Sequence, residues 1–193
     1  MKKLLAIVVL GFLWSGNAHS DDIKDLQIEG FSVGDSLLKY FKESKIKKEI
    51  TPLKKTNYKD NSFLRVGISK NPEVYDTTQF HIKKDDPKYI IYQITGKIFY
   101  RKNINECYED MKSLVSDVEN LNLDATKNAY EKNHSADKTG NSKNTTVQFN
   151  FSNGDAIKIS CYDWSKKMKY TDNLRLSINT SEFSTWLNTK AYK

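Results

Sequence analysis

The clearest repeat of apolar positions lies between residues 103 and 121. Apolar side chains recur there every three or four residues, the spacing that places them on one face of an α-helix. These positions are Ile104, Cys107, Tyr108, Met111, Leu114, Val115, Val118 and Leu121. Asn103, three residues before Glu106, is suited to cap the helix start. The pattern predicts one long helix from about Asn105 to Leu121.

Alternating apolar and polar residues predict strands on both sides of this helix, within 64–68, 80–82, 89–100, 147–151, 157–161 and 174–178. Two further helices are expected, one after Asp35 or Ser36 and one after Thr180 or Ser181. The predicted fold class is α+β: an antiparallel sheet of about five to six strands with two or three helices packed on one face. Residues 124–144 are polar and charged, and we predict a long surface loop there.

The register of the 147–161 hairpin follows from its pattern. A two-residue turn at Asn153-Gly154 would place apolar residues opposite polar ones. A three-residue loop, Asn153 to Asp155, instead pairs Phe151 with Ile157 and keeps every apolar side chain on one face. We therefore predict the longer loop, with a residue near Gly154 in the left-handed region.

Cys107 and Cys161 are the only cysteines. Cys107 falls on the apolar face of the predicted helix and Cys161 on the apolar face of the hairpin. A metal pair would need further ligands, and a catalytic thiol would need a nearby base. We therefore predict a structural disulfide between Cys107 and Cys161.

The N-terminal residues have the three-part layout of a bacterial secretory signal peptide. A basic start at Lys2 and Lys3 precedes an apolar run, Leu4 to Trp14, and Ala18-His19-Ser20 resembles a cleavage site. We predict residues 1–20 as signal peptide and 21–193 as a single domain, periplasmic or secreted. No later stretch approaches the length of a membrane span, so no transmembrane segment is expected after signal removal.

Net charge adds a weaker indication of partners. The chain carries a formal charge of +7, and removal of Lys2 and Lys3 leaves +5 for residues 21–193. A basic excess outside the cytoplasm points to anionic lipid head groups, acidic glycans or acidic protein faces, and away from nucleic acid. The alternative is that these lysines only keep the surface soluble.

Few residues suggest catalysis. His134 lies near Asp137 in the polar segment, but such a pair needs a nucleophile or a metal to act. His81 lies between Phe80 and Ile82 in a predicted strand, and its side chain points to the opposite face. This is the setting of an ordinary packed or surface histidine. Two histidines in the domain cannot form a three-His zinc site, and neither HExxH nor CxxC is present. We therefore expect no enzyme activity, cofactor or metal.

The segment after Cys161 is a better candidate for binding. Tyr162 and Trp164 end a strand and are followed by Lys166 and Lys167. Aromatic rings beside cations suit sugar rings, peptides or anionic head groups. In the alternative interpretation, the aromatics complete the sheet packing and the lysines are only solvated.

Residues 22–41, 96–100, 154–164 and 172–175 resemble a family of exported bacterial proteins of unknown function. Residues 30–41 are also similar to the Gly-x-x-x-Gly-x-Ser opening of small periplasmic modules, some of which assist outer-membrane assembly while others inhibit enzymes. The second similarity implies a binding module. We therefore expect a monomeric, non-catalytic module that binds an envelope protein. Two alternatives remain: a small-ligand or glycan binder using Tyr162 and Trp164, and a hydrolase using His134 and Asp137.

Overall fold

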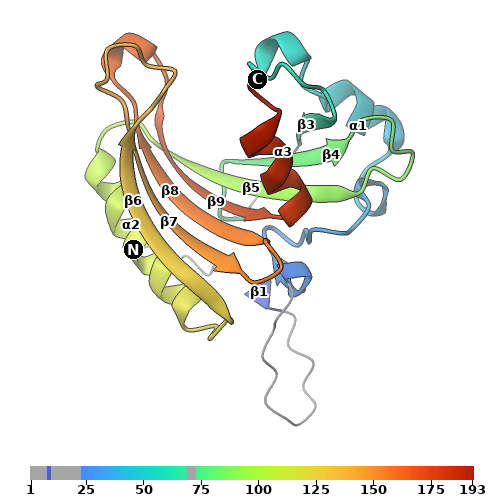
Figure 1. Ribbon diagram of the computed structural model, residues 1–193, viewed down its shortest axis with the longest axis horizontal. Coiled ribbons are helices and arrows are strands. Elements are labelled where there is room, and N and C mark those ends of the chain that lie inside the picture. Colours follow the sequence, from blue (N-terminus) through green and yellow to red (C-terminus); the bar gives the residue numbers. More distant parts are fainter. Residues whose placement is uncertain (1–7, 10–22, 69–72) are drawn as a thin grey trace.

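A computed structural model describes residues 8–9, 23–68 and 73–193 (Figure 1). Its main element is an antiparallel sheet of seven strands in the order β3-β4-β5-β9-β8-β7-β6. The predicted signal peptide lies outside the described residues, except for β1 (Val8–Val9), which pairs with β2 (Leu26–Gln27). The sheet strands are β3 (Phe63–Gly67), β4 (Thr77–Lys83), β5 (Ile91–Tyr100), β6 (Ala125–Asn133), β7 (Lys143–Phe151), β8 (Ala156–Asp163) and β9 (Asp172–Asn179). The α-helices are α1 (Glu43–Glu49), α2 (Ile104–Glu119) and α3 (Ser181–Thr189).

The structure confirms an antiparallel α+β fold, but the predicted strand number was too low. The segment predicted as a polar loop at 124–144 is instead β6, a turn and the start of β7. β6 lies at the sheet edge and its side chains are nearly all exposed. Polar residues are therefore tolerated on both of its faces, and the alternation that marks a strand is absent.

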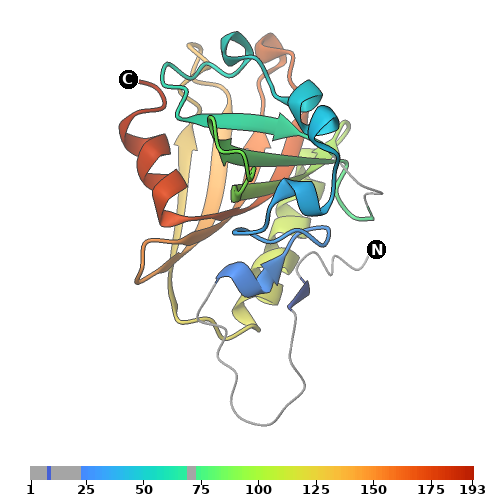
Figure 2. The same cartoon turned by 90° about the vertical axis from the view of Figure 1, so that its right-hand side faces the viewer.

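The helices do not share one face of the sheet, which corrects a second expectation. The sheet is strongly curved, with α2 against its outer side and α3 inside the curve (Figures 1 and 2). On β5, Ile94 packs in the main core with α2, whereas Tyr92 packs with α3. A bulge between β4 and β5 accompanies this change of side. Tyr92 and Ile94 have the same parity in the sequence, so the bulge is what lets them pack against helices on opposite faces.

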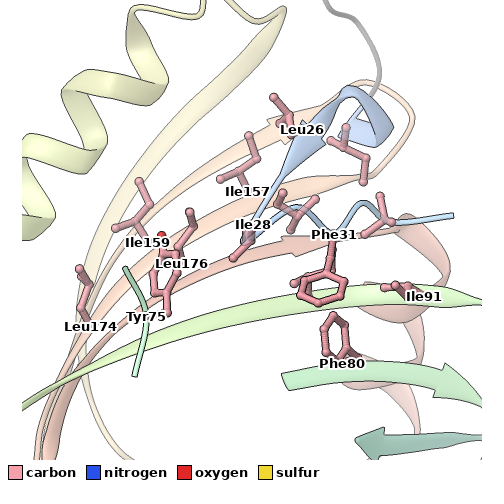
Figure 3. Packing of buried hydrophobic residues seen from close by; sticks show 14 of the residues in the cluster. Leu26, Ile28, Phe31, Tyr75, Phe80, Ile91, Ile157, Ile159, Leu174 and Leu176 are labelled. Carbon is pink, nitrogen blue, oxygen red and sulfur yellow. The ribbon is translucent and has the colours of Figure 1, made fainter. Parts of the chain in front are cut away.

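The main core lies on the outer side of the sheet. Phe31, from the segment before α1, packs edge-on against Phe80 of β4, with ring centroids 4.9 Å apart (Figure 3). Leu26 and Ile28 of the same segment are fully buried. Gly96 of β5 lies against the ring of Tyr75, where a β-carbon would come within 2.6 Å of the ring. The absence of a side chain at Gly96 therefore makes room for the Tyr75 ring.

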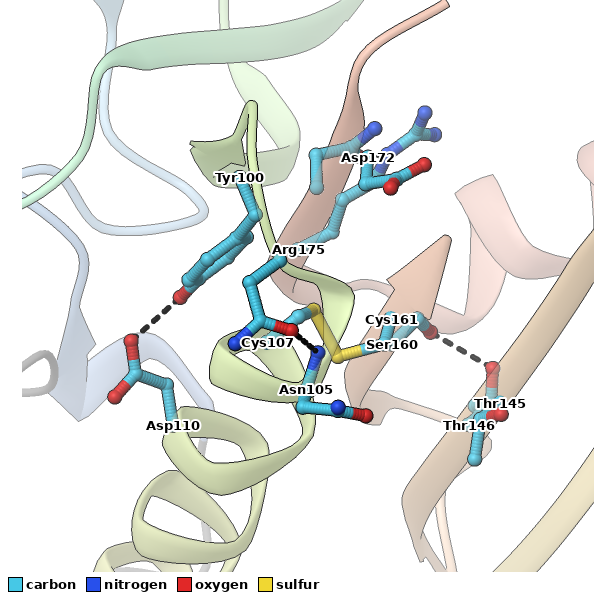
Figure 4. The surroundings of a disulfide bond; sticks show 12 residues. Tyr100, Asn105, Cys107, Asp110, Thr145, Thr146, Ser160, Cys161, Asp172 and Arg175 are labelled. Atoms are coloured by element: carbon cyan, nitrogen blue, oxygen red, sulfur yellow. Dashed lines mark hydrogen bonds between the residues drawn. A yellow bond between two sulfur atoms is a disulfide. The ribbon is translucent and has the colours of Figure 1, made fainter. Parts of the chain in front are cut away.

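The predicted Cys107–Cys161 disulfide is confirmed and joins α2 to β8 across this core (Figure 4). Both cysteines are completely buried. Asn103 caps α2 as expected, its side-chain oxygen accepting a hydrogen bond from the backbone N–H of Asn105 at 3.1 Å. The cap and the disulfide together fix the first turn of α2 against the sheet.

The β7–β8 hairpin has the predicted loop length and the predicted buried face, but its register differs by two residues. Phe149 pairs with Ile157, because the Phe151 N–H bonds the Asp155 carbonyl at 3.0 Å and closes the loop one residue earlier. Gly154 has φ +87°, as the left-handed prediction requires. A shift of two residues keeps the same side chains on the same face, so the apolar pattern alone could not exclude it.

Candidate binding site

The inner side of the curved sheet is polar, because the residues that alternate with the apolar core positions point there. On β8, for example, Lys158, Ser160 and Tyr162 alternate with the buried Ile157, Ile159 and Cys161. α3 covers one end of this inner face through Phe183 and Trp186, which pack on Phe63 and Tyr92. The rest of the inner face is open only in part, because Asn144, Thr146 and Ser160 there are buried.

Two adjoining hollows occupy the open part, and His134 lines both. The first, about 480 Å³, lies over β6–β8 and beside the chain end. The second, about 400 Å³, lies over β9 and the β8–β9 turn. Besides His134, the first is lined by Tyr130, Lys132, Asn133, Ser135, Asn144, Thr146, Lys158, Ser160, Tyr162, Leu187, Asn188 and Tyr192. Besides His134, the second is lined by Lys55, Thr56, Asn57, Arg65, Phe99, Ala136, Trp164, Tyr170, Thr171, Asn173 and Arg175.

Tyr162, Trp164, Tyr170 and His134 form an aromatic wall along these hollows. The rings of Tyr162 and Trp164 are stacked, with centroids 5.8 Å apart and planes at 21°. His134 lies 4.4 Å and Tyr170 4.9 Å from the Trp164 ring centroid. The two aromatics singled out from the sequence are therefore brought together, with Tyr162 lining the first hollow and Trp164 the second.

The wall is held in place by hydrogen bonds at the end of β8. The backbone N–H of Trp164 donates to the Asp172 carboxylate at 2.7 Å. The Ser165 N–H donates to Ser142 Oγ at 3.0 Å, which ties the β8–β9 turn to the β6–β7 turn. Half-buried rings on a fixed backbone give a preformed surface, which lowers the entropic cost of binding a ligand.

The Asp137 carboxylate bonds to the turns and not to the His134 ring. Both Asp137 oxygens accept hydrogen bonds from within the turns: Oδ1 from Thr139, and Oδ2 from the hydroxyls of Ser142 and Ser165 at 2.6 and 2.7 Å. These bonds hold the pKa of Asp137 well below its usual range. His134 Nδ1 accepts from the Ala136 N–H at 3.2 Å. Burial, together with the nearby Arg175 and Lys132, lowers the pKa of His134. Asp137 thus organises the turns and does not orient the histidine.

Lys166 and Lys167 lie in a 3-10 turn (Lys166–Met168) that joins β8 to β9. Both are exposed, and neither lines the two hollows. The cations that line the hollows are Lys132 and Lys158 in the first, and Lys55, Arg65 and Arg175 in the second. Arg65 and Arg175 were missed because each is a single arginine in a strand other than that of Tyr162.

Arg175 of β9 lines the second hollow, and Lys97 of β5 stands directly opposite it in the sheet without lining either hollow. The Arg175 guanidinium stacks over the Tyr162 ring, 3.7 Å from its centroid, and its Nε donates to Asn173 at 2.7 Å. Burial, followed by the charges of Arg175 and Arg65, lowers the pKa of Lys97 to about 7. The sequence could have indicated their side of the sheet. Both residues alternate with core positions along their strands, which places them on the inner face.

His81, the other histidine considered, is packed inside the protein. Its Nδ1 lies 2.6 Å from Gln93 Oε1, its Nε2 lies 3.1 Å from the Tyr58 hydroxyl, and Phe183 packs on its ring. Burial lowers its pKa to about 4, so His81 is neutral near pH 7. Among the described residues, no group of three or more His, Cys, Asp or Glu side chains is placed to hold a metal ion.

Comparisons with known proteins found no matching family model, no matching curated protein and no matching solved structure. None of the helices formed by residues 8–9, 23–68 and 73–193 has the length and apolar character needed to cross a membrane.

Proposed function

We propose that the protein is an exported, non-catalytic binding module that holds a small ring-shaped ligand, a sugar unit, against the aromatic wall on the inner face of its sheet. The observation that carries this proposal is the stacked Tyr162–Trp164 pair beside two preformed hollows. Aromatic faces bind the C–H faces of sugar rings through dispersion and exclusion of water. Each hollow falls in the size range of small-molecule sites.

The arrangement of His134 supports binding over hydrolysis. A hydrolase of the Ser-His-Asp type needs a carboxylate that orients the histidine and a nucleophile within hydrogen-bond reach. Here the Asp137 carboxylate is occupied by Thr139, Ser142 and Ser165. His134 instead contributes its ring to the aromatic wall.

Trp164 provides a direct readout. Among the described residues the tryptophans are Trp164 and Trp186, and Trp186 is buried between α3 and the sheet at 4% exposure. A sugar found on a glycan array should therefore change the fluorescence of Trp164 and leave that of Trp186 constant. Trp164→Ala should abolish binding, while Lys166→Ala in the adjacent turn should leave it unchanged. Absence of any glycan ligand, or binding that survives Trp164→Ala, would refute the proposal.

An envelope-protein partner is the second candidate, favoured by the β6 edge. β6 pairs with β7 on one side only, and eight of its nine residues are exposed. Such an edge can accept a strand from another protein, although Lys127, Glu131 and Lys132 are the kind of residues that protect edges from pairing. A partner captured saturably from envelope extract, retained by Trp164→Ala and lost with Ala129→Asp, would favour this candidate.

A further inference from the structure

The inner face carries positive charge that the fold does not neutralise. Arg65, Lys97 and Arg175, which we call the cation cluster, come from β3, β5 and β9. Arg65 and Arg175 line the second hollow together, and Lys97 is the direct cross-strand neighbour of Arg175. Like charges placed opposite each other on a sheet destabilise it. The cluster therefore has no evident structural purpose.

The cluster also lacks a counter-ion within the described residues. The ion pairs of Lys39, Lys47, Lys83, Lys127 and Lys143, all with substantially exposed side chains, include no residue of the cluster. Neither hollow is lined by an aspartate or a glutamate. The first hollow adds Lys132 and Lys158 to the positive charge. A partly buried cation without a carboxylate is costly, so an anion from outside would be bound favourably.

Arg65 and Arg175 are each held in one orientation, and each has guanidinium N–H groups available to a ligand. Arg175 is fixed by its Nε bond to Asn173 and by stacking on Tyr162, and its terminal NH₂ groups donate to no described acceptor. Arg65 is fixed by contacts to Thr51 Oγ1 at 3.4 Å and to the Lys55 carbonyl at 3.3 Å. A planar guanidinium held in this way suits two-point recognition of a carboxylate or phosphate.

A buried amide in the first hollow gives an independent indication of a ligand. Asn144 is 4% exposed, and its Nδ2 has no hydrogen-bond partner within the described part of the chain. Its Oδ1 already accepts from Thr146 at 2.8 Å. Buried donors of this kind are nearly always satisfied in folded proteins. A ligand oxygen in the first hollow would satisfy this one.

We infer that the cation cluster binds the anionic group of an acidic sugar, a carboxylate or a phosphate, while the sugar ring lies against the aromatic wall. The inference rests on the proposed function and adds the charge of its ligand. Arg175 links the cation cluster to the aromatic wall, because it belongs to the cluster and stacks on Tyr162 of the wall. The two hollows share His134, so a ligand of two sugar units could occupy both.

Calorimetric titration with four probes tests the inference: glucose, glucuronate, glucose 6-phosphate and inorganic phosphate. Glucuronate or glucose 6-phosphate should bind at least tenfold more tightly than glucose, and the tighter of the two identifies the anionic group. Lys97→Met and Arg65→Met should remove this tenfold preference and leave glucose affinity within about twofold. Lys166→Met, which removes the same charge from the exposed turn, should change neither affinity. Thermal melts establish that each variant is folded.

The outcomes separate this inference from the proposed function. Equal affinity for glucose and both acidic sugars, with all binding lost in Trp164→Ala, overturns the anion site and leaves the sugar site standing. Phosphate binding that depends on Lys97 without binding of any sugar retains the anion site and overturns the sugar site. An equal loss of acidic-sugar binding in Lys166→Met shows non-specific charge attraction and overturns the anion site. No binding of any probe at millimolar concentration overturns both.

Discussion

The two faces of the sheet are built from the same strands and have different physical roles. On β8, Ile157 and Ile159 are fully buried against the outer core, while Lys158 between them faces the inner hollows. The outer face gains stability from apolar burial and from the disulfide. The inner face holds partly desolvated polar and charged groups, which cost stability unless they are paired. The outer face explains why the chain folds, and the inner face indicates what the fold presents to a ligand.

Several neutral polar groups of the inner face pair with one another. Thr146 Oγ1 lies 2.8 Å from Ser160 Oγ, and Thr95 Oγ1 lies 2.8 Å from Ser177 Oγ, each across a strand pair. Such pairs let a sheet bury polar side chains at little net cost. Against this background the unpaired cation cluster stands out, and the predictions below test whether the two faces differ as described.

The largest effect is expected from the disulfide of the outer face. The Cys107→Ser/Cys161→Ser double variant should lose about 4 kcal/mol of stability, because the bond closes a loop with a sequence separation of 54 residues. For a domain of this size that corresponds to a fall in Tm of roughly 8–16 °C. Thermal unfolding under oxidising conditions measures it.

Reductant serves as the control for this variant. Reducing the wild-type protein should lower its Tm to that of the double variant, and the same reductant should not shift the variant. If the oxidised wild type and the double variant have the same Tm, the stability of the outer face does not depend on the disulfide. The comparison of the two faces then loses its main support.

A smaller effect is expected at Gly96, also on the outer face. A methyl group there would press on the Tyr75 ring, with the new β-carbon 2.6 Å from ring atoms, so Gly96→Ala should cost about 1–3 kcal/mol. Gly67→Ala in β3 is the matched control, because its β-carbon would meet nothing within 4 Å. Urea denaturation compares the two. Equal stabilities would mean that Tyr75 moves aside and the outer core is loosely packed.

Sequence patterns predicted the outer face because residues buried on one face of a helix or strand recur at a regular spacing in the sequence. The apolar repeat located α2, the alternation at 157–161 placed Cys161 inward, and the two cysteines therefore faced each other. The hairpin register was wrong by two residues because parity is preserved under that shift. β6 was missed because an edge strand exposed on both sides carries no apolar alternation.

The inner face was only partly predictable, for a different reason. Tyr162 and Trp164 are close in sequence, so their proximity could be predicted from the strand end alone. The cation cluster joins residues from three strands, and its assembly depends on the strand order β3-β4-β5-β9, which no local pattern specifies. Lys166 and Lys167 were favoured over Lys97 because they follow Trp164 closely in the sequence. Closeness in sequence was taken to mean closeness in space.

The smallest effect on stability, and the one with opposite sign, is expected at Lys97. Lys97→Met keeps the length of the side chain and removes a charge that faces Arg65 and Arg175, so it should stabilise the protein by about 1 kcal/mol at pH 7, or roughly 2–4 °C in Tm. Lys112→Met on the exposed side of α2 is the matched control and should change stability by less than about 0.5 kcal/mol.

The pH dependence of the Lys97→Met effect shows whether charge is its cause. The pKa of Lys97 is about 7 in the folded protein, below its ordinary value of 10.5. Below pH 7 the lysine is charged in both the folded and unfolded states, and the folded state bears the full cost. Between pH 7 and 10.5 the unfolded state binds more protons, so wild-type stability rises with pH and the advantage of Lys97→Met shrinks. An advantage that is constant across this range would show that the substituted methionine only packs better than the lysine. That result would remove the argument that the inner face sacrifices stability to present a positive charge.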